Sequence, residues 1–89
     1  MPRALILSLA LLLPALASAS PSHSERCGQS VITVGAPMTK LRACGTPWRI
    51  VTLVNEHGAA VAERWEFERD TGLALFTVQG GRVVRIERV

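Results

Sequence analysis

The chain has 89 residues, which is enough for one small domain but not for two. Its 10 basic and 7 acidic side chains give a net charge of +3, and this weak, evenly spread charge argues against nucleic acid as a partner. With 2 histidines and no tyrosine, the chain has few groups for acid–base chemistry. We therefore expect no enzymatic activity and no cofactor.

Residues 1–19 have the features of a signal peptide. Arg3 is followed by an apolar run from Ala4 to Ala17, and Ala17-Ser18-Ala19 matches the small-x-small pattern of a cleavage site. The apolar run is too short to span a bilayer as a helix. No cysteine follows the cleavage site directly, so we expect no lipid anchor. These features predict a periplasmic or secreted protein with a cleaved Sec-type signal and no stable membrane insertion after cleavage.

The remaining residues predict a tail and one domain. Residues 20–26 are polar and include Pro21, which favours a flexible N-terminal tail. Residues 27–89 then form a single small domain.

The only two cysteines, Cys27 and Cys44, predict one disulfide bond, because exported proteins enter an oxidising compartment. Closing a loop of this length stabilises a domain by roughly 3 kcal/mol. The total stability of such a small domain is on the order of 5 kcal/mol. The disulfide would therefore supply a large part of the stability.

The cysteines could have two alternative roles. A redox-responsive periplasmic protein could use the Cys27/Cys44 pair, although the Cys-x-x-Cys spacing of redox proteins is absent. A small metal-binding domain could combine the cysteines with His23 and His57 as zinc ligands, but their spacing fits no known finger. We favour the structural disulfide and predict no metal.

The segment between the cysteines predicts a strand and a helix. Residues 31–34 are β-branched and favour a short strand. Pro37 suits the first position of a helix, which a Gly-x-Pro motif at residues 45–47 would end. One face of this helix carries Met38, Leu41 and Cys44.

The second half of the chain predicts four strands joined by short turns. Turn residues lie at 56–58, 70–72 and 80–81. The strands between them are expected at 48–55, 60–68, 73–79 and 82–89. The expected fold class is thus α+β, with one short helix packed on a small antiparallel β-meander of three to four strands and held by one disulfide.

Alternation along these strands predicts two different sheet faces. The face expected to cover the helix carries Val61, Trp65, Phe67, Val84 and Ile86. The opposite face carries charged residues and is expected to be solvated, with weak surface ion pairs. These residues are Arg64, Glu66, Glu68, Arg85 and Glu87.

A non-catalytic binding module is the leading functional hypothesis. Trp48 and Trp65 are the candidate aromatic anchors. The last strand, which contains Arg85, is a second candidate, because a strand that ends the chain can expose a free edge to a partner. His57 beside Glu56 is interpreted as a solvated turn rather than an acid–base pair.

Residues 26–89 resemble a family of small secreted bacterial proteins, domain of unknown function 2845. The resemblance rests on an opening Cys-Gly, the segment VGAPMTKLRACGTP, the strand ERWEF and the closing segment GGRVVRIE. The plan is also similar to the small domain of the SmpA/BamE-type outer-membrane assembly lipoprotein and to β-lactamase-inhibitor-like modules. The resemblance implies action by contact rather than by catalysis and assigns no catalytic residue. We expect the partner to be an envelope protein.

Overall fold

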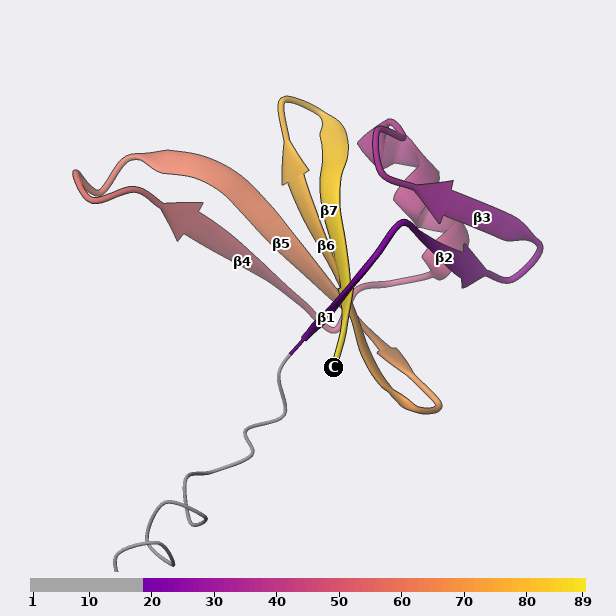
Figure 1. Cartoon of the computed structure of the whole chain (residues 1–89). Helices are drawn as coiled ribbons and strands as arrows, with labels where there is room; N and C mark the ends of the chain where they lie inside the picture. Colours follow the sequence, from indigo (N-terminus) through magenta and orange to yellow (C-terminus); the bar gives the residue numbers. More distant parts are fainter. Residues whose placement is uncertain (1–18) are drawn as a thin grey trace, which may run out of the picture.

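The computed structural model describes residues 19–89 and is built mostly of β-strands (Figure 1). The predicted signal segment, apart from Ala19, lies outside the described residues. The elements in chain order are β1 (Ser20–Ser22), β2 (Ser24–Cys27), β3 (Ser30–Thr33), the 3₁₀ helix η1 (Met38–Cys44), β4 (Arg49–Val54), β5 (Ala60–Arg69), β6 (Gly72–Gln79) and β7 (Arg82–Arg88). Within residues 19–89, no helix is long and apolar enough to cross a membrane.

The predicted α+β fold class is wrong. Strands account for 61% of the structure and the single short helix for 10%, in two antiparallel sheets of five and two strands. The larger sheet has the order β1-β7-β6-β5-β4, and β2 pairs with β3 in the smaller one. The prediction failed because strands were expected only where the sequence is apolar. The polar segment at the start of the domain forms two further strands, β1 and β2.

The predicted meander of four strands is confirmed as β4 to β7. Each strand pairs antiparallel with the next along the chain. Gly80 and Gly81, with φ of 61° and 77°, form the two-residue turn between β6 and β7. Positive φ at both central positions is the geometry that glycine adopts without steric cost.

The predicted flexible tail over residues 20–26 is also wrong. In β1, Ser20 lies opposite Arg88 and Ser22 lies opposite Ile86. The following residues form β2, and Glu25 of that strand is buried. Polar residues can form an edge strand because the pairing uses backbone hydrogen bonds, which do not depend on an apolar side chain.

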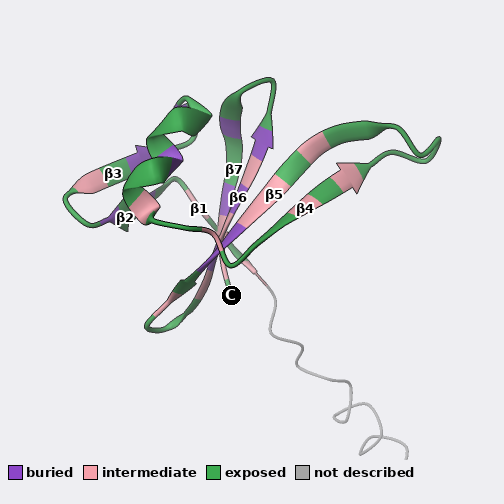
Figure 2. Ribbon diagram, turned by 180° about the vertical axis from the view of Figure 1, so that it is seen from behind, coloured by how far each residue is buried: buried purple, intermediate pink, exposed green. Residues whose placement is uncertain are grey.

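The core lies between one face of the large sheet and the layer formed by the β2–β3 hairpin and η1 (Figure 2). The sheet contributes Phe67, Ala74, Phe76, Val78, Val83 and Ile86, and the covering layer contributes Cys27, Ile32, Ala36 and Leu41. The rings of Phe67 and Phe76 meet edge to face, with centroids 5.5 Å apart.

The helix η1 has 3₁₀ geometry, in which residues three apart lie above one another. The spacing of Met38, Leu41 and Cys44 fits this period, so Leu41 is buried while Cys44 reaches the disulfide. Pro37 is extended at the N-cap, and no side chain caps the helix. The start of η1 is therefore held by tertiary contacts, whereas at its end the backbone N of Gly45 donates to Arg42 O over 3.1 Å.

A bulge in β7 changes which residues face the core. Thr77 lies opposite Arg85 and Val78 lies opposite Val83, so Val84 is an extra residue. Val83 and Ile86 are consequently buried, whereas Val84 is exposed. The predicted shared face of Val84 and Ile86 is therefore wrong.

A second irregularity affects the start of β5. Leu53 lies opposite Ala62 and Val54 lies opposite Ala60, so Val61 is the extra residue. Val61 is exposed, contrary to the prediction, whereas Phe67 is buried as predicted.

Candidate interaction surface

The disulfide between Cys27 and Cys44 is confirmed, and it joins the end of β2 to the end of η1. Cys27 therefore lies at the end of a strand, β2, that the sequence did not predict. Because both sulfur atoms are bonded to each other, neither cysteine is available as a thiolate ligand in this state. Among residues 19–89, no group of three or more potential metal ligands lies together.

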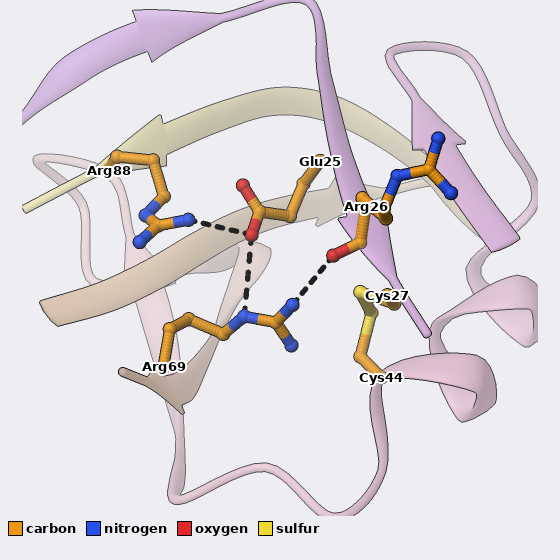
Figure 3. The surroundings of a disulfide bond; sticks show 6 residues. All are labelled: Glu25, Arg26, Cys27, Cys44, Arg69 and Arg88. Carbon is orange, nitrogen blue, oxygen red and sulfur yellow. Dashed lines mark hydrogen bonds and ion pairs between the residues drawn. A yellow bond between two sulfur atoms is a disulfide. The ribbon is translucent and has the colours of Figure 1, made fainter. Parts of the chain in front are cut away.

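A buried carboxylate beside the disulfide fixes the β2–β3 hairpin to the large sheet (Figure 3). Arg88 donates a hydrogen bond from Nη1 to Oε2 of Glu25 over 2.8 Å, and Arg69 Nε lies 3.4 Å from the same oxygen. Arg69 also donates to the backbone carbonyl of Arg26 over 2.6 Å. The covering layer is thus held to the sheet by charge-assisted hydrogen bonds as well as by apolar contact.

This fixed layer forms one wall of an apolar groove of about 300 Å³. Met38, Leu41 and Arg42 of η1 line one side, and the loop that leaves η1 closes one end at Pro47. Trp65 of β5 lines the groove on the sheet side. The groove therefore lies between η1 and the core-facing side of the sheet.

Trp65 presents an aromatic surface whose polar atom is already paired. Its indole Nε1 donates a hydrogen bond to Oε1 of Glu63 over 3.1 Å. Within the sheet, Trp65 lies between Ile50 on β4 and Phe76 on β6. Since the indole nitrogen has a partner, an apolar group can contact the ring without leaving a buried donor unpaired.

A second depression, of about 350 Å³, extends the groove along the sheet. It shares Met38 with the first and is lined by Thr52, Glu63 and Val78, which lie opposite one another on three adjacent strands. The two depressions share Met38 of η1. We refer to the two depressions together as the η1 groove.

The two tryptophans predicted as anchors lie in different places. Trp65 lines the η1 groove, whereas Trp48 lines a separate depression with Glu68 and Leu73. Trp48 is 56% exposed, and Arg49 lies over its ring with Cζ 5.0 Å from the centroid. The structure therefore does not bring the two aromatic candidates into one site.

The predicted free edge at the last strand is wrong. β1 pairs with the second half of β7, and residues 35–38 bond to its first half. Gly35 N donates to Val83 O over 2.7 Å, and Val83 N donates to Ala36 O over 2.8 Å. Arg85 is exposed and contacts Glu87, with 3.2 Å between Nη2 and Oε2. In the large sheet, the long unpaired edge among the described residues belongs to β4.

The charged face opposite the groove contains a buried residue that the sequence did not indicate. Glu66 was expected to be solvated, but it is 2% exposed. Arg49 Nε lies 3.1 Å from its Oε1, and Arg64 Nε lies 2.9 Å from its Oε2. The charges of Arg49 and Arg64, one from the neighbouring strand and one from the same strand, compensate the buried carboxylate.

His57 and Glu56 lie at the tip of the β4–β5 hairpin. His57 Nε2 is 3.6 Å from Glu56 Oε1, and the two side chains are 80% and 86% exposed. The arrangement agrees with the interpretation as a solvated turn.

The chain was also compared with known proteins. No protein-family model matches it, and neither a curated protein nor a solved structure matches it. The resemblance to the domain of unknown function 2845 family and to the SmpA/BamE plan therefore stays a prediction.

Proposed function

We propose that this chain is a non-catalytic protein-interaction module of the bacterial envelope. In this role the η1 groove accepts an extended apolar segment of a partner protein. The observation that carries the proposal is the groove itself, in which Met38 and Trp65 form an apolar surface above the buried Leu41. Grooves that combine an aromatic side chain with aliphatic neighbours are typical binding sites for apolar anchors.

The walls of the groove favour binding because they are held before a partner arrives. The disulfide holds one end of η1, and the backbone N of Met38 at the other end donates to Gly81 O over 2.9 Å. A preformed site avoids the entropic cost of ordering its walls on binding. Met38 at the rim adds a flexible, polarisable side chain that adapts to different apolar partners.

The charge around the groove suggests the character of the partner segment. Lys40 and Arg42 lie on η1, and Arg42 lines the groove directly. The acidic side chain in the second depression, Glu63, already accepts the hydrogen bond from Trp65. We therefore expect an apolar segment with acidic residues on the side that faces η1.

An envelope location is part of the same proposal. The predicted signal peptide supports it, and a disulfide bond is compatible with an oxidising compartment outside the cytoplasm.

The test uses site-specific photocrosslinking in the cells that produce the protein. A photoreactive residue at Met38 is expected to form one adduct with a specific envelope protein. The matched control is Val31 on β3, because the two side chains are 37% and 38% exposed. Equal adducts from both positions, or none from either, would overturn the proposal.

A charge variant gives an independent measurement. Met38→Asp is expected to abolish the adduct formed from a photoreactive residue at Thr39, because an apolar partner segment would have to remove water from the new charge. Val31→Asp should leave the same adduct unchanged. If both variants retain it, the partner does not occupy the groove.

A further inference from the structure

The outer edge of β4 is an unprotected strand edge. β4 pairs with β5 on one side, and no other element of residues 19–89 pairs with it on the other. By contrast, β7 is covered along its outer edge by β1 and by residues 35–38. Backbone groups along β4 are therefore free to bond to an additional strand.

The sequence of β4 lacks the features that normally prevent edge pairing. It contains no proline, and its single charged residue, Arg49, lies at one end and contacts Glu66. The nearby bulge places its extra residue in β5, so β4 itself is regular. Ile50 and Val54 on this edge strand are 45% and 58% exposed. An edge of this kind tends to pair with a strand of another chain rather than to remain exposed to solvent.

We propose that β4 pairs antiparallel with β4 of a second copy of this chain, around a two-fold axis at Thr52. A continuous sheet requires that opposed residues lie on the same face. With Thr52 opposite itself, Ile50 lies opposite Val54 of the second copy, and Val51 lies opposite Leu53. Each exposed apolar residue of β4 then faces an apolar residue.

The apolar pattern of β4 favours a second copy over an unrelated segment, because it is symmetric about Thr52 and therefore matches itself in the antiparallel direction. The charge at the end of the strand does not oppose this pairing. The two copies of Arg49 lie at opposite ends of the paired strands, and each Arg49 is already 3.0 Å from Glu66 Oε1 of its own chain, so the two copies do not repel one another.

The turn that follows β4 is held by the side chain of Asn55. The side-chain Oδ1 of Asn55 accepts hydrogen bonds from the backbone N of His57 over 2.9 Å and of Ala59 over 3.0 Å. Because the axis is perpendicular to the sheet, both η1 grooves face the same side of the dimer. The dimer does not depend on the proposed groove function, since it uses the backbone edge of β4. The two sites adjoin at Thr52, whose side chain also lines the second depression, so the mass of the protein and the crosslinking at Met38 test them separately.

The first experiment measures the mass of the purified protein by sedimentation equilibrium over a range of concentrations. The wild-type mass is expected to rise toward twice the monomer mass. Thr52→Lys should remain monomeric, because two lysines would meet at the axis. Thr33→Lys on β3 is the matched control, because Thr33 is also an exposed threonine in a strand, and it should dimerise like the wild type.

A second variant tests the register and does not depend on the folding of Thr52→Lys. Thr52→Cys is expected to form a covalent dimer without added crosslinker, because opposed residues on the axis lie within disulfide reach. Thr33→Cys should not. A wild-type protein that stays monomeric, a dimer insensitive to Thr52→Lys, or equal crosslinking by both cysteine variants would each overturn the proposal.

Discussion

Replacing Glu66 by glutamine removes a charge from the face of the sheet opposite the groove while keeping the side-chain volume. The carboxylate receives hydrogen bonds from Arg49 and Arg64 and is 2% exposed. A hydrogen bond to a charged group contributes about 1.5–3 kcal/mol, against about 0.5–1.5 kcal/mol between neutral groups. The glutamine amide would also direct one N–H group toward an arginine N–H group.

The side chains of Arg49 and Arg64 are 53% and 33% exposed, so water can solvate them after the change. We therefore discount the full loss and expect Glu66→Gln to reduce the free energy of unfolding by about 2 kcal/mol. For a domain whose stability is on the order of 5 kcal/mol, this is a large fraction.

Urea unfolding followed by tryptophan fluorescence measures this change. The control is Glu68→Gln on the same strand and face, because Glu68 is exposed and forms no ion pair within residues 19–89. The control should lie within about 0.5 kcal/mol of the wild type. Equal midpoints for the two variants, at unchanged m-values, would refute the assignment of Glu66 as a stabilising buried ion.

Two further predictions concern the covalent and backbone constraints of the fold. The double variant Cys27→Ala/Cys44→Ala should lose roughly 3 kcal/mol of unfolding free energy. Wild-type protein unfolded by urea under reducing conditions should show a loss of similar size. An unchanged urea midpoint in both experiments would contradict the stabilising role of the disulfide. Gly72→Ala should lower the yield of folded protein measured by circular dichroism, because its φ is 126° and an added Cβ would overlap the carbonyl of the last residue. Gly58→Ala, with a φ of 81° and open space around it, should cost only about 1 kcal/mol, so equal losses for the two glycine variants would show that the close contact has no effect.

Much of the local structure could be predicted from the sequence. The four strands of the meander and their turns follow from alternation and from turn residues such as Gly80 and Gly81, which act over a few neighbouring positions. The disulfide could also be predicted, since only one pairing is possible between Cys27 and Cys44.

The strand edges could not be predicted in this way. β1 pairs with β7 across most of the chain, and its polar residues carry no strand pattern. The edge of β7 is therefore covered, contrary to the expectation from chain order, and the edge of β4 is free. Two strands pair through hydrogen bonds between their backbone groups, and these groups are the same in nearly every residue type. The side chains of a strand therefore say little about which strand it pairs with.

Of the candidate site, Trp65 was identified from its residue type, but the groove beside it was not. Met38 and Leu41 were expected only to pack a helix face, and their place in the groove wall depends on how η1 lies against the sheet. The bulge at Val84 shows the same limit, because one extra residue reverses the faces of a strand without a clear local signal.

The sequence by itself determined the strands of the meander, their turns and the disulfide, because each depends on neighbouring residues or on a unique pairing. Only the tertiary structure decided which edge is free, where the groove lies and that Glu66 is buried. These features depend on contacts between residues far apart in the chain, such as Glu66 with Arg49 and Ala36 with Val83. Periodicity and composition do not specify which distant segments of the chain are in contact. The surface that is available to a partner depends on these tertiary contacts, so it could not be predicted.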